Sequence, residues 1–222
     1  MQRQIITTAD GSHTIRIAET AITYHSIHGA LQESMHVFIN AGFQSVASSH
    51  NELHVLEIGL GTGLNALLSF AESQKLQKKI YYTAVEPFPL TANEVNALNY
   101  TEQMHKPVLK NVFSIIHSSK WEEDIAIAPA FTLHKMRQSL LDVTLPQEHY
   151  HLVYFDAFAP AVQPELWTEE VFQQLYNTMY PGAVLVTYCS KGNVRRNMQQ
   201  AGFMIEKPPG PPGKREMIRA RK

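Results

Sequence analysis

Short β-forming runs alternate with longer helical patterns along most of the chain. The predicted strands cover residues 53–58, 80–86, 131–136, 151–157 and 181–188. Segments with helical spacing lie between and after them, at 65–73, 89–98, 164–179 and 193–202. Alternation of this kind is typical of a parallel sheet that is covered by helices. The pattern therefore predicts an α/β fold.

The two ends of the chain depart from this alternation. FMIEK (203–207) and REMIRAR (215–221) flank a PPGPPG stretch and are predicted to pair as a closing hairpin. TIRIAETAITYHSIH (14–28) and ESMHVFI (33–39) have strand-like character. We therefore expect residues 1–50 to form a small β-rich extension packed on the core, and residues 51–222 to form the main domain.

One local detail concerns where the second helix begins. Pro89 precedes the helical pattern LTANEVNAL, and a proline costs nothing in the first turn of a helix, where its missing N–H has no partner. The helix at 89–98 is accordingly expected to begin at Pro89.

Composition is that of an ordinary globular protein. Of the 222 residues, 44% are hydrophobic and 18% are charged, and no apolar run approaches the roughly 20 residues of a membrane span. The N-terminal MQRQIITTADGSH lacks the basic-then-apolar order of an export signal, and the single Cys189 cannot form an internal disulfide. These features favour a cytoplasmic protein with no membrane role.

Positive charge gathers at the C-terminal end, although the net charge is only −1. The last 37 residues hold nine of the nineteen basic residues: Lys191, Arg195, Arg196, Lys207, Lys214, Arg215, Arg219, Arg221 and Lys222. Only Glu206 and Glu216 oppose them. This asymmetry indicates a patch for a polyanion such as nucleic acid, and the alternative is a solvated basic tail.

Three glycines follow the first predicted strand, at positions 59, 61 and 63. Glycine permits unusual backbone dihedrals and lets backbone N–H groups touch a ligand at the carboxyl end of a parallel strand. Because position 64 is Leu, the dinucleotide fingerprint is not satisfied, and no Gly-Lys-Ser/Thr follows to cradle a triphosphate. The alternative is a purely structural turn.

Two acids complete this pattern. Glu57 precedes the glycine turn, and Glu86 ends the second strand, where an acid can accept the ribose hydroxyls of a nucleoside. The combination resembles the first two motifs of the seven-strand, Rossmann-like S-adenosylmethionine-dependent methyltransferases. The resemblance implies S-adenosylmethionine as cofactor, bound by Glu57, Gly59, Gly61, Gly63, Asn65, Glu86 and Pro87, with Tyr24, Ser26 and Glu33 closing the pocket over the amino acid end of the donor.

Further motifs narrow the resemblance to one family. The chain carries, in order, YHSIHGALQESMHVFI (24–39), GLGTGLN (59–65), EPFPLT (86–91), DAFAPAVQPELW (156–167), NVRRNMQQAGF (193–203) and GKREM (213–217). This order is similar to the tRNA wobble-uridine methyltransferases, the methyltransferase half of the bacterial bifunctional enzyme that makes 5-methylaminomethyl-2-thiouridine. The resemblance implies a stand-alone methyltransferase acting on the amine of 5-aminomethyl-(2-thio)uridine in the tRNA anticodon loop.

The expected chemistry assigns roles to the remaining residues. A primary alkylamine is mostly protonated at neutral pH, so a carboxylate such as Asp156 can attract the cation and then remove a proton. Phe158 is expected to stack on the target uracil, with Pro160 beside it, and Trp167 to pack in the core. The expected phosphate contacts are Lys191, Arg195, Arg196, Lys214 and Arg215.

Two other functions remain open at this point. An aminopropyl transferase of the polyamine-synthesis type has a related fold and a motif similar to DAFAP, and a non-catalytic RNA-binding module could keep a degenerate donor fold.

His25, His28 and His36 are irregularly spaced and have no Cys partners, so no metal is predicted. Near the third strand, Gln138 and Ser139 stand where the family has an acid for adenine, so that contact has no assigned residue. The sequence makes no prediction of oligomeric state.

Overall fold

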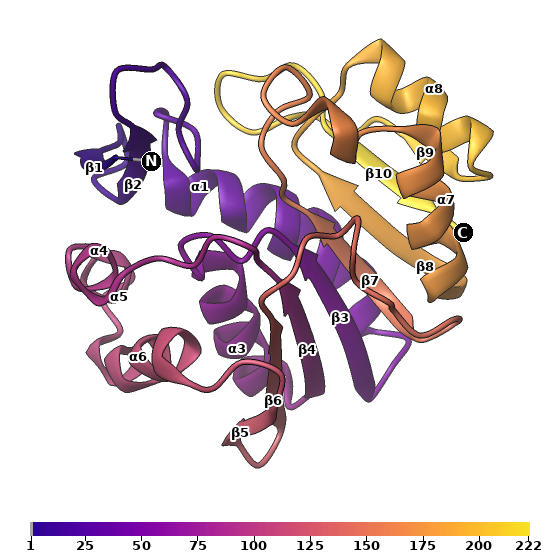
Figure 1. The fold of residues 1–222 in the computed structure, drawn as a ribbon. Helices are drawn as coiled ribbons and strands as arrows, with labels where there is room; N and C mark the ends of the chain where they lie inside the picture. Colours follow the sequence, from indigo (N-terminus) through magenta and orange to yellow (C-terminus); the bar gives the residue numbers. More distant parts are fainter. Residues whose placement is uncertain (1) are drawn as a thin grey trace.

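A mixed sheet of eight strands forms the centre of the computed structural model, which describes residues 2–222 (Figure 1). From edge to edge the strands are β5 (Asp124–Ala128), β6 (Phe131–Met136), β4 (Lys79–Val85), β3 (Glu52–Ile58), β7 (Tyr150–Phe155), β8 (Met179–Thr187), β10 (Ile218–Arg221) and β9 (Met204–Glu206). The five strands from β6 to β8 run parallel, and β10 is antiparallel to both of its neighbours.

This order confirms the predicted seven-strand, Rossmann-like fold and adds one strand. The five predicted parallel strands are all present, and β9 pairs with β10 as the closing hairpin, with Ala220 opposite Ile205. The extra strand β5 forms an antiparallel edge pair with β6. A reversed strand is tolerated at the edge because antiparallel neighbours need only a short turn between them.

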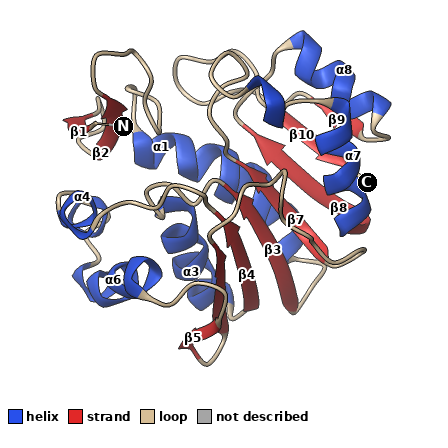
Figure 2. Ribbon diagram, viewed as in Figure 1, coloured by secondary structure: helices blue, strands red, loops and turns tan. Residues whose placement is uncertain are grey.

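Helices cover both faces of the sheet, as Figure 2 shows. The helices α3 (Leu64–Leu76), α4 (Ala92–Asn96), α5 (Tyr100–Gln103) and α6 (Lys110–Ser118) contribute to one hydrophobic cluster, and α7 (Glu169–Thr178) and α8 (Gly192–Gln200) to the other. Neighbouring residues of a strand point to opposite faces, so Val55 and Leu56 of β3 enter different clusters. Strands buried on both faces explain the continuous apolar runs of the sequence.

Two helices begin later than the sequence pattern predicted. Helix α4 begins after Thr91, which forms a capping box with Glu94, so Pro89 lies outside the helix. Helix α7 begins after Thr168, whose hydroxyl accepts a hydrogen bond from the Val171 N–H, and the 3₁₀ turn η3 (Pro164–Leu166) precedes it. In both cases a side-chain cap fixes the start of the helix more strongly than the preceding proline does.

The N-terminal region begins as a hairpin and continues as a helix. Strands β1 (Arg3–Thr7) and β2 (His13–Ile17) form a separate antiparallel pair, as expected of a β-rich extension. The predicted strand at 33–39 is wrong, because α1 (Ala30–Ser34), the π-helix η1 (Met35–Phe43) and α2 (Gln44–Ala47) follow one another there.

Tertiary packing explains this helix. Its apolar residues Val37, Phe38 and Ile39 are buried in the cluster that also contains Leu152 and Val184 of the sheet. Gly42 lies so close to the sheet that a Cβ there would come within 2.9 Å of Val186 Cγ2. These three residues have high β-propensity, but here they are buried against the sheet as part of a helix and do not pair in a strand. The division of the chain at residue 50 stays a prediction.

Candidate active site

A cavity of about 690 Å³ opens at the carboxyl ends of β3, β4 and β7. Its walls come from the glycine turn after β3, the loop after β4, the loop after β7, the segment 21–28 and the segment 212–214. Figure 1 shows the N-terminal hairpin and the loop before β10 at this same edge of the sheet. The volume and location are those of a ligand site in an open parallel sheet.

The three glycines of the turn make room mainly for the protein itself. All have positive φ angles, of 89° at Gly59, 49° at Gly61 and 71° at Gly63. A Cβ at Gly59 would come within 2.7 Å of the Asp156 backbone oxygen, and one at Gly61 within 3.2 Å of the Tyr24 ring. Both residues line the cavity, whereas Gly63 faces the His117 ring of α6 and does not. The glycines therefore let three chain segments meet at the cavity wall.

Glu86 is held firmly at the end of β4. Its Oε2 accepts a hydrogen bond from the Gly61 N–H at 2.9 Å, and its Oε1 accepts one from the Phe88 N–H at 2.8 Å. Burial raises the pKa of Glu86, while these two backbone hydrogen bonds oppose the rise. Each oxygen keeps a lone pair, so the carboxylate can still accept two hydroxyl groups from a ligand.

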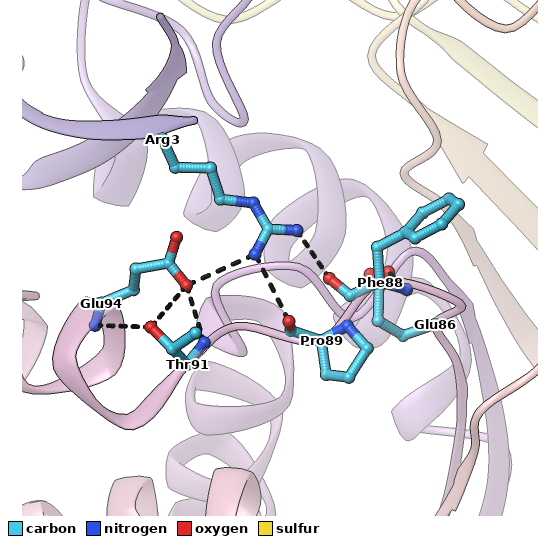
Figure 3. A network of polar contacts seen from close by, with 6 residues as sticks. All are labelled: Arg3, Glu86, Phe88, Pro89, Thr91 and Glu94. Atoms are coloured by element: carbon cyan, nitrogen blue, oxygen red, sulfur yellow. Dashed lines mark hydrogen bonds and ion pairs between the residues drawn. The ribbon is translucent and has the colours of Figure 1, made fainter. Parts of the chain in front are cut away.

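Arg3 of β1 fixes the loop that follows Glu86, as Figure 3 shows. Its guanidinium donates to the Phe88 oxygen at 2.8 Å and to the Pro89 oxygen at 3.3 Å, and it pairs with Glu94 at 3.3 Å. The N-terminal hairpin is therefore attached directly to one wall of the cavity. Sequence reasoning missed Arg3, because its partners lie 85 or more positions away and no local motif marks it.

Asp156 lies just beyond β7, faces the cavity and is partly exposed to it. The Asn65 side-chain amide donates to Asp156 Oδ2 at 2.9 Å and to Glu57 Oε1 at 3.0 Å. Burial, followed by the charge of Glu33, raises the pKa of Asp156 to about 7, against the Asn65 hydrogen bond and the charge of Lys214. A carboxyl group with this pKa can exchange protons at neutral pH.

Glu57 and Asn65 stand behind Asp156 rather than in the cavity wall. Glu57 is fully buried, and burial raises its pKa well above the ordinary value, with the nearby Asp156 charge adding to the rise. Burial of this kind favours the neutral form of a carboxyl group. The cavity lining does not include these two residues, although the sequence predicted donor contacts for both.

Lys214 enters the cavity and pairs with Glu33. Its ammonium lies 2.6 Å from Glu33 Oε2 and 4.1 Å from the centre of the Tyr188 ring. The Lys214 charge is directed inward to an acid here, and its contact with phosphate stays a prediction. Tyr188 is a cavity residue that the sequence analysis did not select, although its place at the end of a predicted strand was a usable signal.

The two aromatic residues of the loop after β7, Phe158 and Trp167, have different surroundings. Phe158 lines the cavity and lies edge-on to Tyr24, with 5.0 Å between ring centres. Trp167 is buried and donates its indole N–H to the Phe158 oxygen at 2.8 Å, which confirms its packing role.

The structure brings only some of the predicted site residues together. The cavity lining includes Tyr24, Ser26, Gly59, Gly61, Glu86, Pro87, Asp156, Phe158 and Lys214. It does not include Glu57, Gly63, Asn65, Pro160, Lys191, Arg195, Arg196 or Arg215. Glu57, Gly63 and Asn65 are buried behind the wall, and Pro160 belongs to the loop after β7. Arg195 and Arg196 lie on α8, Lys191 immediately precedes this helix, and Arg215 lies in the loop before β10. The sequence therefore located the cavity but did not distinguish the residues that line it from those that lie behind or outside it.

The histidines near the cavity have structural contacts. His25 is buried and shares a hydrogen bond of 2.6 Å with the Thr62 hydroxyl, and burial lowers its pKa to about 4.

Within residues 2–222 no group of three or more His, Cys, Asp or Glu side chains is arranged to hold a metal ion. Over the same range, no helix has both the length and the apolar character needed to cross a membrane.

The fold and the acid-lined cavity are typical of a Rossmann-like protein that binds a ligand containing a nucleoside. A family profile described as S-adenosyl-L-methionine-dependent methyltransferase matches residues 97–222. The chain belongs to this family, and S-adenosylmethionine is its cofactor. The cavity fits such a donor, because Glu86 can accept hydroxyl groups there and Gly61 presents no side chain to obstruct it.

Curated relatives cover most of this chain. The chain is 31% identical over 210 residues to the tRNA 5-methylaminomethyl-2-thiouridine biosynthesis bifunctional protein MnmC of Pseudomonas entomophila, covering 84% of this chain and 30% of that protein. It is 32% identical over 208 residues to MnmC of Ectopseudomonas mendocina, covering 88% and 31%. The chain thus spans less than a third of the length of these relatives.

Solved structures share the fold. The crystal structure of MnmC2 from Aquifex aeolicus has a TM-score of 0.76 and 21% identity, covering 99% of this chain and 70% of that chain. Spermidine synthase from Thermotoga maritima has a TM-score of 0.58 and 12% identity, covering 99% and 68%. At these identities the likeness defines the architecture alone.

Proposed function

We propose that this chain transfers a methyl group from S-adenosylmethionine to the amine of 5-aminomethyl-(2-thio)uridine at the wobble position of tRNA. The observation that carries the proposal is Asp156, an acid with a pKa of about 7 that faces the donor cavity beside a second acid, Glu33. Two acids in one cavity suit an acceptor that arrives as a cation. The MnmC relatives, whose names include tRNA 5-methylaminomethyl-2-thiouridine biosynthesis, support the acceptor.

The residues around the cavity have distinct tasks in this reaction. Bound S-adenosylmethionine supplies an electrophilic methyl group on a sulfonium. Glu86 would accept the ribose hydroxyls, and the backbone of Gly59 and Gly61 would lie against the donor. Tyr24, Ser26 and Pro87 would complete this half of the site.

Asp156 acts on the acceptor. Its carboxylate attracts the substrate ammonium and accepts one proton from it, which frees the nitrogen lone pair for in-line attack. Glu57 and Asn65 support this group from behind through the shared Asn65 amide. Phe158 and Pro160 would contact the uracil ring, as aromatic side chains do with splayed RNA bases.

Basic residues outside the cavity are available for the anticodon loop. Lys191, Arg195, Arg196 and Arg215 make no ion pair within residues 2–222, and Arg195 is the least exposed of the four. Cations without an acidic partner are suited to phosphate groups, which position an RNA without reading its sequence. This proposal includes a bacterial origin for the protein and a cytoplasmic location for its reaction with tRNA.

The direct test is transfer of labelled methyl from S-adenosylmethionine to bulk tRNA from bacteria that cannot complete wobble-uridine methylation. We expect label in 5-methylaminomethyl-uridine after digestion to nucleosides. A parallel reaction with putrescine and decarboxylated S-adenosylmethionine tests the aminopropyl alternative, which the acid pair would also suit. Donor binding without any labelled RNA would contradict the tRNA assignment, and a polyamine product would replace it.

A further inference from the structure

The ammonium of Lys214 lies in a defined cage inside the cavity. Glu33 Oε2 is 2.6 Å from the Lys214 nitrogen, and the centre of the Tyr188 ring is 4.1 Å from it. The Glu33 side chain is only 7% exposed, against 32% for that of Lys214. An acid and an aromatic face together form a binding site for an organic cation.

Both walls of the cage are held by contacts that do not involve Lys214. Glu33 Oε1 accepts a hydrogen bond from the Ser26 N–H at 2.9 Å. The Tyr188 hydroxyl donates to the Ala157 oxygen at 2.9 Å, and Ala157 adjoins Asp156. The cage is therefore preformed, and it lies next to the candidate proton acceptor.

The lysine itself is the adaptable part. It is carried by the segment 207–217, where Pro212 and Gly213 are exposed, and its flexible stem bears a compact charge. The segment is anchored separately, because the Met217 N–H donates to the Pro208 oxygen and the His36 ring bonds the Pro209 oxygen at 2.8 Å. Lys214 can thus leave the cage without breaking the closing hairpin of the sheet.

We propose that the Glu33–Tyr188 cage is the subsite for the alkylammonium of the substrate, and that Lys214 occupies it as a surrogate until the substrate displaces it. This inference rests on the proposed function, since 5-aminomethyl-uridine carries a primary ammonium on a methylene group, the same head group as lysine. The cage selects a cationic acceptor over a neutral one.

Removal of a lysine that contacts phosphate would raise the KM for tRNA, whereas removal of a lysine that competes with the substrate would lower it. If Lys214 fills the cage for about nine-tenths of the time, the apparent affinity for the substrate is reduced about tenfold. Lys214→Met is therefore expected to lower the KM for tRNA bearing 5-aminomethyl-uridine by up to about tenfold. The matched control is Lys207→Met, which removes a cation of the same segment that pairs with Glu216 at the surface. The control is expected to leave KM unchanged.

Binding of n-propylammonium gives a second readout that does not require methyl transfer. Calorimetric titration is expected to show tighter binding to Lys214→Met than to the wild-type chain, and loss of that gain when Glu33→Gln is added. Thermal unfolding of each variant establishes that it is folded. A KM that rises or stays level in Lys214→Met, or equal propylammonium affinity in both chains, would overturn the surrogate role.

The two readouts separate this inference from the proposed function. A wild-type chain that methylates the tRNA, together with a Lys214→Met variant whose KM is not lowered, contradicts the cage alone. A wild-type chain that fails to methylate any tRNA, together with Lys214→Met binding propylammonium more tightly, contradicts the tRNA assignment and keeps the cage as an alkylammonium site.

Discussion

Titratable side chains gather at both ends of the parallel sheet, but in different ways. At the carboxyl ends, Glu33, Glu86 and Asp156 line one cavity. At the opposite ends, four histidines lie together near the starts of β3 and β7: His50, His54, His149 and His151. Burial shifts the pKa of one member of each group toward the neutral form, up to about 7 for Asp156 and down to about 4 for His151.

The two groups differ in what their polar atoms face. His54 and His149 share a ring-to-ring hydrogen bond of 2.8 Å, and His151 Nδ1 accepts one from the His54 N–H at 3.0 Å. His54 and His151 also pack on Tyr81 and Tyr180. The acids instead face a cavity of about 690 Å³. A shifted pKa therefore marks a candidate site only when the group also faces a space that a ligand can enter.

The largest expected difference between the two ends comes from Asp156→Asn. Loss of the proton acceptor is expected to lower turnover by about 10²–10⁴-fold while donor binding is retained, as measured by methyl transfer and calorimetry. The same substitution is expected to raise the free energy of unfolding at pH 8 by about 1–2 kcal/mol, because it removes a desolvated carboxylate from the partly exposed site. Unchanged turnover would remove Asp156 from the mechanism.

The pH dependence of turnover is the next effect in size. Asp156 must be deprotonated to accept a proton, and its pKa is raised mainly by burial to about 7. The deprotonated fraction is about one half at pH 7 and about one hundredth at pH 5, so turnover at saturating substrate should fall roughly 50-fold between these two pH values. Glu33→Gln should move the midpoint to lower pH, because the Glu33 charge contributes to the raised pKa. A profile that is flat down to pH 5 would contradict this assignment.

Arg3→Met tests whether the N-terminal hairpin supports the donor half of the cavity. The substitution removes two hydrogen bonds to the loop that follows Glu86 and an ion pair with Glu94 of α4, so we expect affinity for S-adenosylmethionine to fall about tenfold. Arg16→Met is the matched control, since Arg16 lies in the same hairpin and, among residues 2–222, its side chain hydrogen-bonds only Gln4. Equal donor affinity in both variants would show that the hairpin is not needed for the site.

The smallest expected effect is on the histidine cluster. Burial lowers the pKa of His151 in the folded chain below its unfolded value of about 6.5. Protonation of the unfolded chain therefore lowers the free energy of unfolding as the pH falls from 6.5 toward 4, and His151 causes no such loss above pH 6.5. His151→Phe should reduce the acid-induced loss by about 1 kcal/mol after allowance for solvent screening, with turnover unchanged at pH 8.

Urea unfolding at pH 7.5 and pH 5 measures that difference. His105→Asn is the control, because His105 is exposed and its left-handed backbone suits asparagine. If the free energy of unfolding falls equally between pH 7.5 and pH 5 in the His151 variant and in the control, the histidine cluster does not cause that fall.

Local patterns were sufficient for much of the fold. The central strands are buried on both faces, so they read as continuous apolar runs, and β3 and β4 lie within a residue or two of their predicted bounds. Edge strands β1 and β5 are short and half-exposed, and the pattern did not predict them. The helix over 30–47 was predicted in part as a strand, because Val37, Phe38 and Ile39 are β-forming residues whose actual conformation follows from burial against the sheet.

The sequence by itself determined the positions of the parallel strands along the chain, the glycine turn and the acids at the strand ends, because these depend on burial and dihedral preferences within a few residues. Only the tertiary structure decided that Arg3 supports the loop after Glu86, and that Lys214 faces Glu33 instead of solvent. These contacts join residues 85 to 181 positions apart. A contact of that kind depends on how the finished sheet brings distant segments to one edge, and no local pattern in the chain encodes it.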